Sequence, residues 1–174
     1  MDAITSLRES IGTSRWLLTG TLEGLTADLA HKHPGGKAHP IAALYAHTVL
    51  SEDMMINGML QGKQPLAASS FAGKTGISEM PPHESEGPTD WTDWGKRVKV
   101  DLAAAQAYAQ AVYAATDAYL STLKPDDLDR KVQLAGMDMS VNTVIDIAAS
   151  SHAASHTGEI AAIKGIQGEK GFPL

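Results

Sequence analysis

The sequence predicts an all-α protein built as a four-helix bundle, and two observations indicate this fold. Apolar residues recur every three or four positions over four long segments, a spacing typical of amphipathic helices. Strand-like alternation is confined to one short stretch, 131–140. Because 174 residues suffice for one buried core, we expect a single domain spanning residues 1–174.

The first two helices are expected on either side of a short segment rich in histidine and glycine. The first begins at Asp2 and ends at about Leu29, but Gly20 and Gly24 weaken its second half, since glycine costs roughly 0.5 to 1 kcal/mol in a helix interior. The second begins at Pro40, a favoured first residue of a helix. Its apolar face contains, in order, Ile41, Leu44, His47, Ser51, Met54 and Gly58.

The third helix is predicted after a long loop. The loop, 62–87, is rich in glycine, proline and serine and has no sustained periodicity. Apolar spacing then predicts a helix from Trp91 to Leu123, with Thr89 or Asp90 as its N-terminal cap.

The fourth helix follows a brief extended or hairpin-like connection at 131–140. It is expected to begin near Val141 and to end around Gly165 and Gly168. Its apolar face contains Val141, Ile145, Ala148 or Ala149, His152, His156, Ile160 and Ile163.

Loop lengths predict the order in which the four helices run. Short first and third connections favour antiparallel neighbours. The long loop 62–87 can return along a helix of about 30 Å, so the second and third helices can be parallel. The predicted topology is therefore up-down-down-up, with a long crossover between helices two and three.

Composition excludes several classes of function. The formal charge of −6 opposes general attraction to nucleic acids or anionic lipids. The absence of cysteine excludes disulfides, thiolate zinc sites, iron–sulfur clusters and a cysteine nucleophile. The beginning of the chain does not resemble a secretory signal, and no apolar stretch is long enough to span a membrane. We therefore expect a cytoplasmic protein with no nucleic-acid or membrane partner.

Three histidines occupy positions on the predicted apolar faces. His152 and His156 are four residues apart, so their rings leave one helical face on successive turns, and His47 lies on the face of another helix. Buried polar groups without partners cost roughly 1 to 3 kcal/mol each, and a shared divalent metal ion would give all three a partner. Three imidazoles leave a coordination position open, as in catalytic zinc sites, and nickel would also suit them. The alternative is that they are ordinary core or semi-exposed histidines bonded to carbonyls.

The residues around His152 and His156 do not match a metalloprotease motif. Ala153 follows His152, so the H-E-x-x-H signature is absent. Glu159 shares a face with His156, which makes it a candidate partner of that histidine, a candidate proton acceptor, or a member of an ordinary ion pair.

Three further expectations concern residues near these histidines. We expect Glu52 and Asp53 to be solvated, because they should point away from the His47 ring. The glycine-rich loop does not pre-organise its three histidines for a metal, so we expect them to face solvent. They are His31, His33 and His39. The aromatic residues Trp16, Tyr45, Trp91 and Trp94 are expected in core or interface packing, or at the mouth of a pocket.

The chain resembles the DinB-like superfamily of putative metalloenzymes over essentially its whole length. The resemblance rests on the run from His152 to Ile160, on the single histidine His47 in an earlier helix, and on the glycine-rich ending. It implies an up-down-down-up four-helix bundle, zinc or nickel held by three histidines, and a homodimer. By position, the implied ligands are His47, His152 and His156. Thr157 and Glu159 stand where many relatives have Arg and Gln.

The resemblance also implies a class of reaction. Characterised relatives include transferases that use low-molecular-weight thiols, and a metal ion makes a thiolate available at neutral pH. The leading hypothesis is a metal-dependent enzyme that transfers such a thiol to a small electrophile. The alternatives are a metal-dependent hydrolase, with Glu159 as catalytic proton acceptor, or a non-catalytic metal-binding bundle of the stress response.

Overall fold

The computed structural model describes residues 2–82, 91–134 and 136–174. Most of these residues are helical, and β-structure among them consists of one hairpin and one isolated bridge, which confirms the predicted all-α class. In chain order the elements are α1 (Ala3–Thr21), α2 (Ala27–His31), α3 (Ile41–Glu52), the π-helix η1 (Asp53–Leu60), the 3₁₀-helix η2 (Leu66–Ala68), α4 (Trp91–Arg97), α5 (Leu102–Leu120), the 3₁₀-helix η4 (Pro125–Asp129), β1 (Lys131–Leu134), β2 (Met137–Ser140), α6 (Val141–Ile145), the π-helix η5 (Asp146–Ser151) and α7 (His152–Ile166).

The first predicted helix is divided into α1 and α2. α1 ends at Thr21, and Gly24 then adopts a φ of 70°, a conformation that glycine tolerates better than other residues. The hydroxyl of Thr26 accepts a hydrogen bond from the Leu29 N–H and so caps α2. The prediction of one continuous helix to Leu29 is therefore wrong. The helix ends between Gly20 and Gly24, the part of the segment that glycine was expected to weaken.

The second predicted helix begins as expected but changes type. Pro40 is the N-cap of α3, and α3 continues without interruption into η1. A π-helix bonds each residue to one five positions away, so the apolar face rotates relative to an α-helix. Met54, expected on the apolar face, is 39% exposed. Glu52 at the end of α3 and Asp53 at the start of η1 were expected to be solvated, but both are buried.

The third predicted helix is interrupted between α4 and α5. Val100 forms an antiparallel bridge with Ile77 from the long loop, and its N–H donates to His31 Nε2 at 3.0 Å. These contacts replace helical hydrogen bonds, so the continuous helix predicted for 91–123 is wrong although the apolar spacing runs across the break.

A new N-terminus starts α5 after this break. The Asp101 carboxylate accepts hydrogen bonds from the N–H groups of Ala103 and Ala104 and caps the helix. The predicted caps Thr89 and Asp90 lie outside the described residues. Asp101 therefore has a capping role that the periodicity of the sequence did not indicate.

The last part of the chain follows the prediction more closely. β1 and β2 form an antiparallel hairpin in which Val132 pairs with Met139, as expected for the connection before the fourth helix. That helix comprises α6, η5 and α7 in one continuous segment. Because η5 has wide turns, Ala148 and Ala149, between which periodicity could not choose, are both buried.

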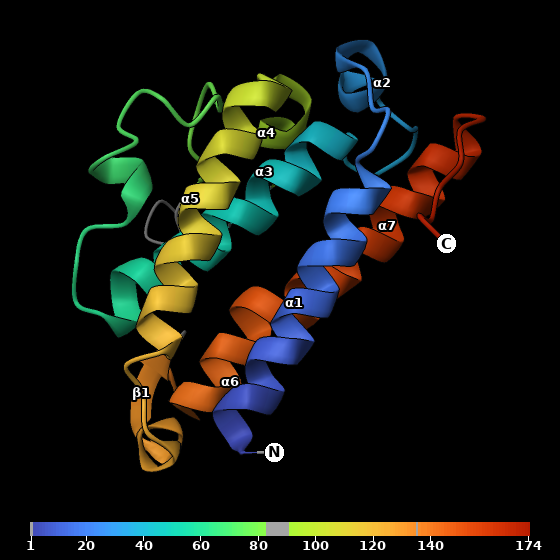
Figure 1. Ribbon diagram of the computed structural model, residues 1–174. Helices are drawn as coiled ribbons and strands as arrows, with labels where there is room; N and C mark the ends of the chain where they lie inside the picture. The colour runs from blue at the N-terminus through green and yellow to red at the C-terminus, as the bar shows by residue number, and fades with distance from the viewer. Residues whose placement is uncertain (1, 83–90, 135) are drawn as a thin grey trace.

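The helices pack around an apolar interior with two groups of buried residues. α1 lies against η5 and α7, while α3 contacts both α7 and α5 (Figure 1). One buried group includes Leu44, Tyr108 and Ile160, and the other includes Ile11 and Ile145. Among the described residues, no helix is long and apolar enough to cross a membrane.

Candidate metal centre

Three histidine rings meet where α3 packs against α7. His47 lies within α3, His152 is the first residue of α7, and His156 follows one turn later. His152 Nε2 is 2.9 Å from His47 Nε2 and 3.0 Å from His156 Nε2. One ring nitrogen from each residue lies within 4.8 Å of the others, which is close enough for a single metal ion.

These contacts cannot all be satisfied as hydrogen bonds. A neutral ring nitrogen carries either one proton or one lone pair, so it makes one good hydrogen bond. His152 Nε2 faces two other ring nitrogens at hydrogen-bonding distance. A cation between the rings would accept the lone pairs of all three, so the donor set fits a divalent metal ion better than a network of hydrogen bonds.

Burial keeps two of these imidazoles neutral. Burial, reinforced by the neighbouring His152, His156 and His39, lowers the pKa of His47 to about 3. Burial and the neighbouring His156 lower the pKa of His152 to about 4. Both rings therefore have a free lone pair at neutral pH, which metal binding requires.

Partners on the other side of two rings set their orientation. His156 Nδ1 lies 3.0 Å from Glu159 Oε2, so a proton held on Nδ1 leaves the Nε2 lone pair directed at the cluster. His47 packs edge-on against Trp91, with ring centroids 4.3 Å apart, and its Nδ1 is 3.5 Å from Ser51 Oγ. Glu159 is thus placed as the partner of His156, one of the roles that its spacing indicated.

A cavity of about 350 Å³ opens beside the histidines. Its walls combine apolar and aromatic side chains with a few polar ones, as is typical of small-molecule sites. The residues that line it are His39, Ala43, Leu44, His47, Trp91, Trp94, His156 and Glu159.

The four aromatic residues singled out in the sequence have different environments. Trp91 and Trp94 line the cavity, and the Trp94 indole N–H donates to the Glu79 carbonyl at 3.1 Å. Tyr45 is buried in the core, whereas Trp16 is 56% exposed on α1. Two of the four therefore lie at the candidate site.

Three loop histidines were expected to face solvent, but two of them contact other parts of the protein. The His31 ring lies between the Ala27 carbonyl, 2.8 Å from Nδ1, and the Val100 N–H. His39 lines the cavity. Its ring packs closely on Gly95 of α4, because a Cβ added to Gly95 would lie only 2.5 Å from His39 Nδ1. Sequence reasoning missed His39 as a site residue. His39 directly precedes Pro40, the N-cap of α3, which places it near the start of the helix that carries His47. Only the packing of α4 against His39 shows that its ring lines the cavity.

The two acids after His47 belong to two other groups of polar contacts, separate from the histidines. Glu52 pairs with Arg15, which also bonds Asp117, and burial raises the pKa of Glu52 while Arg15 opposes that shift. The Asp53 carboxylate accepts a hydrogen bond from the Tyr108 hydroxyl at 2.7 Å. They were expected in solvent because they should point away from the His47 ring, but almost every residue of α3 is buried, so the other sides of the helix also face the interior.

These features define a helical protein with a candidate site for a divalent metal ion. A family model described as the DinB superfamily matches residues 11–160, and the chain belongs to this superfamily.

A solved structure has the same fold. The crystal structure of a conserved protein from Enterococcus faecalis aligns with a TM-score of 0.79 and 20% identity, covering 95% of this chain and 97% of that chain. At this identity the likeness shows the fold alone. No curated protein matches the chain.

Proposed function

We propose that His47, His152 and His156 bind one divalent metal ion, zinc or nickel, and that the protein is an enzyme. The proposed reaction is transfer of a low-molecular-weight thiol to a small electrophile. The observation that carries the proposal is the meeting of three ring nitrogens beside a cavity of about 350 Å³. Three protein ligands leave a position for an exogenous group, and the cavity gives such a group a route to it.

Each residue around the cavity has a distinct part in this proposal. When bound, a divalent ion supplies Lewis acidity that lowers the pKa of a thiol or a water molecule. Glu159 holds the proton on His156 Nδ1, which keeps the Nε2 lone pair available. Trp91, Trp94 and Leu44 offer an apolar wall for the carbon skeleton of the electrophile. The chain has no cysteine, so the thiol arrives as co-substrate.

A hydrolase is the second candidate. Glu159 lines the cavity and its side chain is 40% exposed, so a carboxylate oxygen is available to accept a proton from water. The same carboxylate already accepts from His156, which favours the thiol-transfer proposal. A non-catalytic metal-binding bundle would not require the cavity.

We propose that the helices form an up-down-down-up four-helix bundle, that residues 1–174 are one domain, and that two copies form a homodimer. The domain proposal is supported by the contacts that join α1 to α7 across the length of the chain. Light scattering at high protein concentration tests the homodimer, which a monomeric mass would rule out.

The proposed reaction is tested in two steps, which measure thiol binding to the metal and thioether formation separately. Protein loaded with cobalt(II) is titrated with neutral small thiols such as 2-mercaptoethanol, and a thiolate-to-metal absorption band is expected. Thioether formation with a chromogenic haloarene is then expected for wild type and for His33→Ala, whose ring is exposed, and is expected to be lost in His47→Ala. A cobalt-loaded protein that neither shows the band nor forms thioether contradicts thiol transfer. Ester hydrolysis that is lost in Glu159→Gln while the variant keeps its metal, at saturating metal concentration, would favour the hydrolase.

A further inference from the structure

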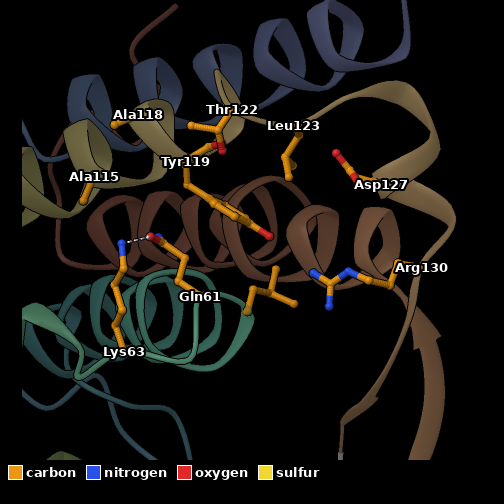
Figure 2. A pocket seen from close by; sticks show the side chains of 10 residues that line it. Gln61, Lys63, Ala115, Ala118, Tyr119, Thr122, Leu123, Asp127 and Arg130 are labelled. Atoms are coloured by element: carbon orange, nitrogen blue, oxygen red, sulfur yellow. Dashed lines mark hydrogen bonds between the residues drawn. The ribbon is translucent and has the colours of Figure 1, made fainter.

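A second cavity of about 690 Å³ lies away from the histidines (Figure 2). It is formed where the end of η1, the second half of α5 and the η4 turn come together, and it shares no lining residue with the cavity beside the histidines. Its size is within the range of cavities that hold small organic molecules. Nothing in the proposed metal chemistry uses this cavity.

One part of the wall is apolar and firmly held. Leu60 is buried, and Leu123 and the ring of Tyr119 pack against the same group of core residues. Ala115 and Ala118 from α5 add small side chains that leave room above this surface. The cavity therefore offers an apolar surface to a ligand without any rearrangement of the core.

The polar part of the wall contains two donors without partners. Among the described residues, neither the Arg130 guanidinium nor the Tyr119 hydroxyl has a hydrogen-bond or ion-pair partner, and Figure 2 shows both directed towards the middle of the cavity. The Asp127 carboxylate, by contrast, accepts a hydrogen bond from the Lys124 N–H at 2.7 Å. Lys63, at the far side, donates to Gln61 Oε1 at 2.9 Å.

Charge favours an anion in this cavity. Lys63 and Arg130 outnumber Asp127 along its wall, although the chain as a whole carries a formal charge of −6. A guanidinium forms paired hydrogen bonds with carboxylates, and a phenol hydroxyl can donate a further one. The apolar wall beside these donors suits a ligand with a hydrocarbon body.

We propose that this cavity binds a small organic acid, a monocarboxylate with an apolar body. Its carboxylate pairs with Arg130 and accepts from the Tyr119 hydroxyl, and its hydrocarbon part lies on Leu60 and Leu123. This proposal does not depend on the metal or on the proposed reaction.

The test uses the metal-free full-length protein, so that a carboxylate cannot bind through a metal ion. Hexanoate is titrated by calorimetry, with 1-hexanol and hexylamine as ligands of equal chain length. Saturable binding is expected for hexanoate, with affinity for the other two at least about tenfold weaker, since a charge-assisted pair is lost. Amide NMR shifts are expected to change at 60–63 and 115–130.

Two variants and a matched control assign the binding to this wall. Arg130→Gln is expected to weaken hexanoate binding by about tenfold or more, and Tyr119→Phe by a smaller factor, because it removes one neutral donor and keeps the ring. Lys131→Gln removes the same charge one residue away, outside the cavity wall, and is expected to stay within about twofold of wild type. Arg130 is exposed, so its replacement should leave the helical circular dichroism unchanged.

Three results would overturn the proposal. They are an absence of saturable hexanoate binding, equal affinity for hexanoate and 1-hexanol, and equal loss of affinity in Arg130→Gln and Lys131→Gln. The last of these would show a general charge effect in place of a site.

Discussion

Two polar groups, the half-buried His47 and the buried Asp53, lie six residues apart in the continuous segment formed by α3 and η1, and they differ in how their hydrogen-bonding atoms are satisfied. The Asp53 carboxylate accepts hydrogen bonds from the Leu66 and Ala67 N–H groups, the Tyr108 hydroxyl and the Asn57 amide. The rings around His47 instead direct nitrogens at one another. The hydrogen-bond acceptors of Asp53 are satisfied by donors of the same chain, whereas the ring nitrogens of the histidines need a bound ion to be satisfied.

A structural polar group can therefore be distinguished from a ligand site by its hydrogen-bond partners. Burial alone does not separate them, because Asp53 is buried and burial also lowers the pKa of the half-buried His47. What separates them is whether every donor and acceptor has its own partner. We therefore assign a role in stability to the Asp53 network and a role in metal binding to the histidine cluster.

The largest expected effect is a loss of stability when the Asp53 carboxylate is removed. Asp53→Ala should lower the free energy of unfolding by about 3 to 5 kcal/mol, because buried donors, including the Tyr108 hydroxyl, lose their acceptor. Chemical denaturation measures this loss. Asp28→Ala, at an exposed position in α2, is the control and should change stability by less than about 1 kcal/mol. A loss below about 1 kcal/mol in Asp53→Ala would contradict the structural role.

The pH dependence of the metal-free protein tests the neutrality of the histidines. The pKa values of His47 and His152 are lowered in the folded state to about 3 and about 4, so the unfolded chain binds more protons between these values and about 6.5. The free energy of unfolding should therefore fall between pH 7 and pH 5, by on the order of 1 to 2 kcal/mol for each histidine.

Denaturation curves at several pH values, recorded with a chelator present, measure this dependence. The double variant of His47→Gln and His152→Gln is the control, since it lacks both titrating groups. Its stability should vary less between pH 7 and pH 5 than that of wild type. An identical pH dependence in both proteins would show that these rings are not held neutral.

A smaller effect is expected when the partner of His156 is changed. Glu159→Gln keeps an acceptor oxygen but removes the charge, so metal affinity should weaken by about 10- to 100-fold. Competition with a chromophoric chelator at fixed pH measures this change. Glu169→Gln, at an exposed position near the end of the chain, is the control. Equal affinities in the two variants would mean that Glu159 does not support the site.

The smallest effect on stability and metal affinity is expected at Gly95. A methyl group there meets His39 Nδ1 at 2.5 Å, so Gly95→Ala should move the His39 ring and alter thiol or electrophile binding in the cavity. Metal affinity should stay within about twofold, because His39 is not among the proposed ligands. Gly12→Ala in α1, where an added Cβ meets nothing within 4 Å, is the control. Unchanged ligand binding in Gly95→Ala would remove His39 from the site.

The sequence allowed the helical class, the hairpin and the three histidines to be predicted, because each depends on local periodicity or composition. It could not place Glu52 and Asp53, because α3 is buried on almost every side by helices from distant parts of the chain, and periodicity does not reveal that packing. The break before α5 depends on the bridge between Ile77 and Val100, a contact between distant parts of the chain. His39 joins the cavity through its packing on α4, which periodicity does not reveal.

Metal uptake by the untagged, metal-free protein tests whether the three histidines form a metal site. Titration with zinc or nickel should saturate at one equivalent per chain and raise the thermal unfolding midpoint, because a ligand that binds the folded state stabilises it. His47→Ala, His152→Ala and His156→Ala should each abolish the uptake and remain helical, whereas His33→Ala should bind as wild type does. Uptake that fails to saturate, or that survives the loss of any one of the three histidines, would contradict the claim that their unsatisfied ring nitrogens form a metal site.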